Sequence, residues 1–121
     1  MRIGTRVLCR GNAYTICEIV RDGKWMIQDF SHELSGEQQA EIIALIRRIA
    51  DEGLPSNPSR FKHEEDQIYA IKDGQVRISC FFDKGALILL TNGAVKKTQK
   101  ADPTDLDMAK KLRKAYMEAK E

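Results

Sequence analysis

The sequence has few cysteines and no long apolar run, and both absences narrow the class of protein. Its three cysteines, Cys9, Cys17 and Cys80, are widely spaced and form no CxxC pair. This spacing favours neither a disulfide framework nor a zinc site. No apolar run approaches the roughly 20 residues that span a bilayer, and the first residues lack the apolar part of a secretory signal. We therefore expect a cytoplasmic protein that contacts no membrane.

Histidine is also scarce, since the chain contains only two, His32 and His63. They lie far apart, and no pattern of acidic residues suggests a magnesium site. The sequence therefore predicts neither a metal nor another cofactor. With 121 residues, we expect a single domain with one core over residues 1–121.

The net charge of +2 is small, but the charged residues are unevenly distributed. Five basic and two acidic residues occur in 1–27, four and nine in 28–66, and eleven and seven in 67–121. A positive surface would form if the two basic ends meet in the fold. The alternative is that these charges are spread over a solvated surface, and composition alone favours it.

The first half of the chain contains one strong helix signal. Residues 14–20 (YTICEIV) predict a strand, whereas residues 25–30 (WMIQDF) suit either a hairpin partner or the start of a helix. Ser35 and Gln38 form a capping-box pattern before an apolar series at helical spacing. Gly53 follows that series, so a helix is predicted from Ser35 to Glu52.

Three strands and a helix are predicted in the second half. The strands Ile68–Lys72, Gln75–Asp83 and Ala86–Val95 are separated by tight turns and form a meander. Asp102-Pro103 then opens a final helix. The whole pattern predicts an α+β fold: a small antiparallel sheet with an N-terminal strand, one or two helices on one face, the meander and a C-terminal helix.

Polar side chains gather on one face of the predicted meander. A turn through Asp73-Gly74 would pair Lys72 with Gln75, and alternation adds Arg77 to their face. The full set is Lys72, Gln75, Arg77, Ser79 and Asn92, with Asn92 opposite Arg77 and with Lys96, Lys97 and Lys100 following the last strand. Such a cluster can hold a phosphodiester. It suits a simple phosphate or an acidic partner equally well.

One histidine precedes the meander, in the segment Phe61-Lys62-His63. Imidazole titrates near neutral pH, so His63 is a candidate general acid or base. The alternative is an inert surface histidine, which is the more common case.

The run from Ile68 to Lys100 resembles the phage-derived, HigB-like branch of the RelE/ParE toxin superfamily. The resemblance rests on Tyr69-Ala70-Ile71-Lys72, on Arg77 before Phe81-Phe82-Asp83, and on residues 95–100 (VKKTQK). It covers about Tyr14 to Lys114, and Met1 to Ala13 matches nothing in the family, so residues 1–13 are a candidate extra segment.

The resemblance implies a toxin of a toxin–antitoxin system that cleaves mRNA on the ribosome without a metal. Lys72 would assist deprotonation of the attacking 2′-hydroxyl, Arg77 would stabilise the scissile phosphate, and Lys97 would lie near the leaving group. Lys96, Lys100, Lys62 and His63 are expected to bind RNA. The implied partners are mRNA, the ribosome and a cognate antitoxin of helix-turn-helix type.

The sequence departs from the family pattern at three positions. Ala70 and Asp73 stand where relatives carry basic residues, and Pro103 stands near the place of a tyrosine. Two other functions therefore stay open. One is a ParE-like inhibitor that binds DNA gyrase without chemistry, and the other is a catalytically decayed relative that binds only its antitoxin.

Overall fold

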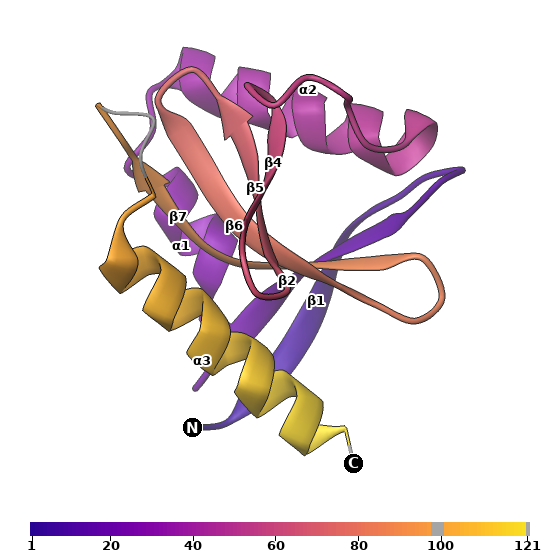
Figure 1. Ribbon diagram of the computed structural model, residues 1–121, viewed down its shortest axis with the longest axis vertical. Coiled ribbons are helices and arrows are strands. Elements are labelled where there is room, and N and C mark those ends of the chain that lie inside the picture. The colour runs from indigo at the N-terminus through magenta and orange to yellow at the C-terminus, as the bar shows by residue number, and fades with distance from the viewer. Residues whose placement is uncertain (98–100, 121) are drawn as a thin grey trace.

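The computed structural model describes residues 1–97 and 101–120, and its strands form one sheet flanked by helices (Figure 1). The strands are β1 (Ile3–Arg10), β2 (Thr15–Arg21), β3 (Lys24–Trp25), β4 (Phe61–Glu65), β5 (Ile68–Asp73), β6 (Val76–Asp83) and β7 (Leu87–Val95). The helices are α1 (Met26–Ser31), α2 (Gly36–Glu52) and α3 (Pro103–Ala119). The predicted α+β class is confirmed.

The main path of the sheet runs in the order β1-β2-β7-β6-β5-β4, and β3 pairs with β2 beside this path. The predicted meander is present as β5, β6 and β7. The pairing of β2 with β7 is parallel, whereas the other pairings are antiparallel. Strands from both ends of the chain thus meet at the centre of the sheet.

The first sheet face is covered by α1 and α2. Apolar residues of the helices, among them Phe30, Leu45 and Ile49, form one core cluster with Ile78 and Leu90 of the sheet. Ile88, Cys80 and Val76 also belong to this cluster, so β6 directs its even-numbered residues towards these helices, as the sequence predicts.

The second face is covered by α3, which crosses it diagonally (Figure 1). Ala109 and Leu112 of α3 pack with Phe81 and Leu89 of the sheet in a second cluster. The face that carries the predicted site is therefore partly covered by the C-terminal helix.

The capping signals of the two long helices are confirmed. The Ser35 hydroxyl accepts from the Gln38 N–H at 3.1 Å, and the Gln38 side chain accepts from the Ser35 N–H at 3.0 Å. Asp102 caps α3 by accepting from the Thr104 N–H at 2.8 Å. Of the apolar series in α2, Ile42, Leu45, Ile46 and Ile49 are buried, whereas Ile43 is 47% exposed.

The ambiguous segment 25–30 is mostly helix. Its first residue ends β3 and the rest forms α1, whose N-cap residue Trp25 offers no side-chain cap. Glu18 of β2 supplies the cap instead, since its carboxylate accepts from the N–H groups of Ile27 and Gln28 at 2.9 and 3.0 Å. A residue distant in the sequence thus decides where this helix starts.

Two strands were not predicted. β1 lies within the segment that matched no known pattern, and β4 covers the charged residues 61–65 (FKHEE). Both lie at the ends of the strand order. Among the described residues, no helix is long and apolar enough to cross a membrane.

Candidate functional site

Lys72 and Arg77 lie directly opposite each other on β5 and β6. The predicted pairing of Lys72 with Gln75 is wrong, because Asp73 pairs with Val76 and the turn consists of Gly74 and Gln75. Gly74 has φ +57°, which glycine adopts without strain. The corrected register keeps Lys72 and Arg77 on one face and removes Gln75, which is exposed in the turn.

The predicted partner of Arg77 on β7 is also wrong. Arg77 lies opposite Ala94 for two reasons: the β6–β7 turn is one residue longer than predicted, so that Asp83 pairs with Leu87, and a bulge between Ile78 and Cys80 shifts the register once more. Asn92 instead donates from its side chain to the Asp105 carbonyl of α3 at 3.2 Å. Asn92 therefore helps to hold the helix on this face.

A polar cluster on one sheet face suggests that Arg77 is open to solvent, but the structure shows that Arg77 is buried. Both Arg77 and Lys72 are only 6% exposed, and Ser79 beside them is 5% exposed. Two features contribute to this burial: α3 packs on the same sheet face, and the Lys72 ammonium donates to the Pro58 carbonyl at 3.4 Å. The candidate site is therefore a buried pair of cations near the β5–β6 turn, and not a surface patch.

Burial changes the acid–base behaviour of Lys72. It lowers the pKa of the Lys72 ammonium below its ordinary value, and the nearby charges of Arg77 and Lys62 lower that pKa further. Glu64 has the opposite effect on the same group. A lysine with a lowered pKa is more often neutral, and only the neutral amine can accept a proton.

Glu64 is a residue that sequence reasoning missed. It occupies the bulge of β4, between the paired residues His63 and Glu65. Its Oε1 atom is buried and has no hydrogen-bond partner among the described residues. No signal in the sequence distinguishes Glu64 from the other charged residues of this segment, because only the fold places it near Lys72.

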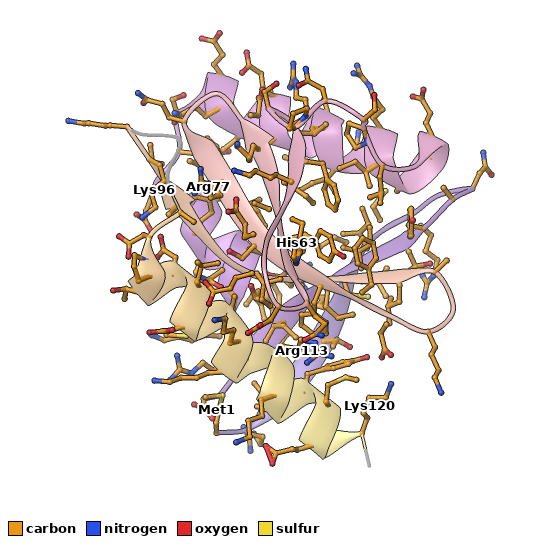
Figure 2. All side chains as sticks on the ribbon, in the orientation of Figure 1. Met1, His63, Arg77, Lys96, Arg113 and Lys120 are labelled. Atoms are coloured by element: carbon orange, nitrogen blue, oxygen red, sulfur yellow. The ribbon has the colours of Figure 1, made fainter. Side chains whose placement is uncertain are left out.

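Lys96 is held by acidic side chains at the start of α3. Its Nζ lies 3.2 Å from Asp102 Oδ2 and 2.5 Å from Asp105 Oδ2, and these contacts raise its pKa. Its backbone N–H donates to the Gln75 carbonyl at 2.7 Å, which places it beside the β5–β6 turn. Figure 2 shows Lys96 and Arg77 at this end of the sheet. Lys96 therefore helps to hold the start of α3 against the sheet.

Of the other predicted site residues, Lys62 lies near Lys72, whereas the structure does not bring His63 to it. Lys97 is exposed, and Lys100 lies outside the described residues. His63 faces Tyr69, with ring centroids 4.9 Å apart, and its Nε2 lies 2.5 Å from the Asp66 carbonyl oxygen. Lys62, one residue earlier and exposed, points to the opposite side of the strand from His63.

Tyr116 is also unavailable to this site. Its hydroxyl donates to Asp83 at 2.6 Å, at the far end of β6 from Arg77. Burial and this carboxylate raise the pKa of Tyr116 to about 12. Among residues 1–97 and 101–120, no three His, Cys, Asp or Glu side chains are grouped to hold a metal ion.

Residues 29–114 match the family described as phage-derived Gp49-like proteins. The chain belongs to this family. The match covers most of the sequence and includes Lys72, Arg77 and the start of the tail after β7, so these positions of the Gp49-like protein lie inside the family region. β1 and β2 lie before it. No match was found among curated proteins.

Proposed function

We propose that this Gp49-like protein is the toxin of a toxin–antitoxin system and cleaves mRNA on the ribosome. The observation that carries the proposal is the buried Lys72–Arg77 pair. Like charges directly opposite each other on neighbouring strands destabilise a sheet. Burial of both charges adds a desolvation cost. Two cations side by side on one sheet face can together bind a phosphodiester, which gives the pair a functional reason.

The proposed reaction uses the 2′-hydroxyl of the RNA as the nucleophile. Neutral Lys72 accepts the 2′-hydroxyl proton while the 2′-oxygen bonds to the adjacent phosphorus. Arg77 stabilises the charge that develops on the phosphoryl oxygens. The bond from phosphorus to the 5′-oxygen then breaks, and Lys97 protonates the leaving oxygen. The products are a 2′,3′-cyclic phosphate and a free 5′-hydroxyl, and no step requires a metal.

The ribosome would supply the alignment that this small site lacks. In-line attack needs the 2′-oxygen, the phosphorus and the leaving oxygen to be held in one geometry. Alignment of this kind contributes about 7–11 kcal/mol to lowering a barrier. A single lysine that accepts a proton contributes less. We therefore expect mRNA in the ribosomal A site to be the substrate and a cognate antitoxin to silence the protein.

A non-enzymatic function is the second candidate, and one observation favours it. Lys96 is occupied by Asp102 and Asp105, so the basic cluster is smaller than the sequence suggests. The alternatives are a ParE-like inhibitor of DNA gyrase and a decayed relative that binds only its antitoxin. Neither needs two cations directly opposite each other on one sheet face, as Lys72 and Arg77 are, and this favours the nuclease.

Pulse labelling after induced expression separates these functions. A nuclease should stop amino-acid incorporation before nucleoside incorporation, and mRNA 5′ ends should accumulate within translated codons. Cleavage by purified protein should require intact ribosomes and leave a 2′,3′-cyclic phosphate and a 5′-hydroxyl, the products of attack by the 2′-hydroxyl. An early fall in DNA synthesis with intact translation would favour gyrase inhibition. Unchanged growth would favour the decayed relative.

A further inference from the structure

β1 forms one edge of the sheet, far from the Lys72–Arg77 site. It is the first strand of the order β1-β2-β7-β6-β5-β4, and it lies outside the family region 29–114. On its outer side, no other strand of the described residues pairs with it. An edge strand presents backbone N–H and C=O groups in a row, so it can receive an added strand.

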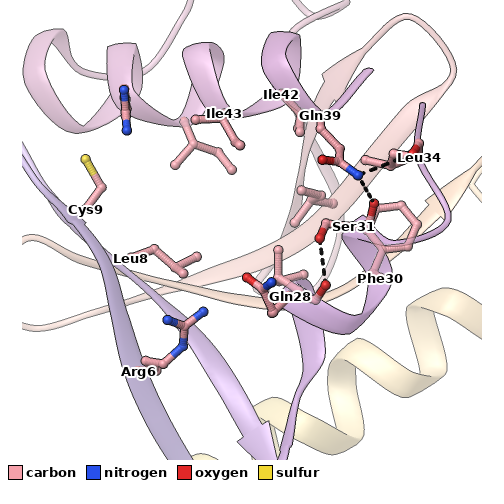
Figure 3. A pocket seen from close by; sticks show the side chains of 14 residues that line it. Arg6, Leu8, Cys9, Gln28, Phe30, Ser31, Leu34, Gln39, Ile42 and Ile43 are labelled. Atoms are coloured by element: carbon pink, nitrogen blue, oxygen red, sulfur yellow. Dashed lines mark hydrogen bonds between the residues drawn. The ribbon is translucent and has the colours of Figure 1, made fainter. Parts of the chain in front are cut away.

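An apolar groove lies beside this edge on the α1–α2 face. Figure 3 shows Leu8 and Cys9 of β1 on one side and Ile42 and Ile43 of α2 on the other. The groove has a volume of about 370 Å³. A segment that added to β1 could place apolar side chains in this groove.

The charge on β1 indicates which kind of segment fits. No acidic residue precedes Glu18, whereas Arg2, Arg6 and Arg10 recur at every fourth position. Arg6 is paired with Glu18, but Arg2 and Arg10 are exposed. A second copy of β1 would pair poorly, because an antiparallel register centred on Arg6 places Arg2 opposite Arg10. Like charges opposite each other are destabilising.

We propose that β1 and the adjoining groove bind an extended acidic segment of a partner protein. The segment adds to the sheet edge through backbone hydrogen bonds. Its carboxylates pair with Arg10, which the bulge between Val7 and Cys9 places on the α3 face, and its apolar side chains, at the alternate positions, fill the groove on the other face. Strand addition obtains affinity from the main chain and specificity from alternate side chains. An antitoxin would be such a partner under the proposed function, but this docking requires no RNA chemistry.

The test is a titration of the isotope-labelled full chain, followed by NMR. The probe is an eight-residue peptide of alternating Glu and Val, which matches β1 in length. We expect amide shifts and slower hydrogen exchange in Ile3–Arg10, methyl shifts at Ile43, and a change in the fluorescence of the only tryptophan, Trp25. Its ring lies 4.2 Å from the Arg6 guanidinium. A peptide of alternating Lys and Val should produce none of these changes.

A charge reversal sharpens the test. The double variant Arg2→Glu, Arg10→Glu should lose the Glu–Val peptide and bind the Lys–Val peptide. The matched control Lys111→Glu, Lys114→Glu changes the same charge on the exposed side of α3 and should keep wild-type binding.

Three outcomes would overturn the proposal. Equal shifts with both peptides would mean nonspecific contact. If the amide signals of β1 did not shift with the Glu–Val peptide, the arginines would serve only to keep other strands from pairing with this edge. An RNA oligonucleotide that shifted β1 through Arg2 and Arg10, while the peptide did not, would make the edge an RNA surface. Each readout is independent of cleavage, so failure here and failure of the nuclease proposal are distinguishable.

Discussion

Along the main path of the sheet, two pairs of charged residues lie opposite each other across antiparallel strands of the described chain, and one pair has opposite charges whereas the other has equal charges. Arg6 and Glu18 join β1 to β2 with opposite charges, and the fully buried Glu18 also caps α1. Lys72 and Arg77 join β5 to β6 with equal charges, both nearly buried. The first pair completes its own hydrogen bonding and stabilises the fold. The second pair places two cations on one sheet face, where Lys72 also donates to the Pro58 carbonyl at 3.4 Å, and we assign function to it because two adjacent cations can together bind a phosphate.

The largest effect on stability is expected at Glu18. The variant Glu18→Gln removes the charge that Arg6 pairs with and weakens the cap of α1. Breaking a buried ion pair costs about 3–5 kcal/mol, and we expect about 3 kcal/mol because Arg6 is partly exposed. Urea denaturation measures the free energy of unfolding. The control Glu33→Gln, at an exposed position, should change it little. Equal values for both variants would remove Glu18 from the structural role.

At Lys72 we expect a large effect on cleavage and little loss of stability. The variant Lys72→Met keeps the aliphatic volume and removes the buried charge, so the free energy of unfolding should stay equal or rise by up to about 1 kcal/mol. Loss of the proton acceptor should lower ribosome-dependent cleavage by about 10²- to 10⁴-fold. Melting temperature and cleavage rate are measured on the same preparation. A folded, fully active variant would contradict the proposed role of Lys72.

Arg77 provides the matched comparison for Lys72. The variant Arg77→Lys keeps the charge but loses the planar guanidinium that binds phosphate through two hydrogen bonds. We expect it to be nearly as inactive as Arg77→Ala. Full activity of Arg77→Lys would mean that charge alone suffices at this position.

A pH-dependent effect is expected at Asp83, which joins the β6–β7 hairpin to the end of α3. Hydrogen bonds from Lys120 and Tyr116 lower the pKa of Asp83 to about 2. Its ionised form therefore stabilises the fold above its ordinary value of 3.8, and this stability is lost as the pH falls towards 2. Melting temperatures should favour wild type over Asp83→Asn near neutral pH and converge near pH 2. A constant difference across this range would contradict the assignment.

The smallest effect is expected at Lys96. Its ion pairs with Asp102 and Asp105 are partly exposed, so Lys96→Gln should cost under about 1 kcal/mol and leave cleavage almost unchanged. Lys97→Gln, one residue later, should leave stability unchanged and lower cleavage, because Lys97 is the proposed proton donor. Single-turnover rates on ribosomes compare the two. The reverse order would assign the leaving-group role to Lys96.

Sequence reasoning was most accurate where local signals agree. The capping box of α2, the Asp102 cap of α3 and the three strands of the meander were all predicted, because capping and short turns depend on neighbouring residues. The two missed strands lack such signals. β4 is charged and exposed along much of its length, and it is a strand because β5 pairs with it.

The candidate site was predicted in part for the same reason. Alternation along β5 and β6 correctly placed Lys72 and Arg77 on one face. The predicted turn was wrong, but the partner of Lys72 changed from Gln75 to Arg77, which is an even number of residues, so the face stayed the same. Their burial was not predictable, since it depends on where α3 packs after β7. The proximity of Glu64 to Lys72 depends on the pairing of β4, which no local pattern reveals.

The sequence by itself determined the class of fold, the ends of the long helices and the residue types available for anion binding. These properties follow from hydrophobic period, capping and turn chemistry, which act over a few residues. Only the tertiary structure decided that Glu18 caps α1, that Lys96 is paired with α3 and that Lys72 and Arg77 are buried opposite each other. Each of these depends on contacts between segments distant in the chain. There, burial and charge–charge interactions decide the conformation, and the local conformational preference of the residues does not.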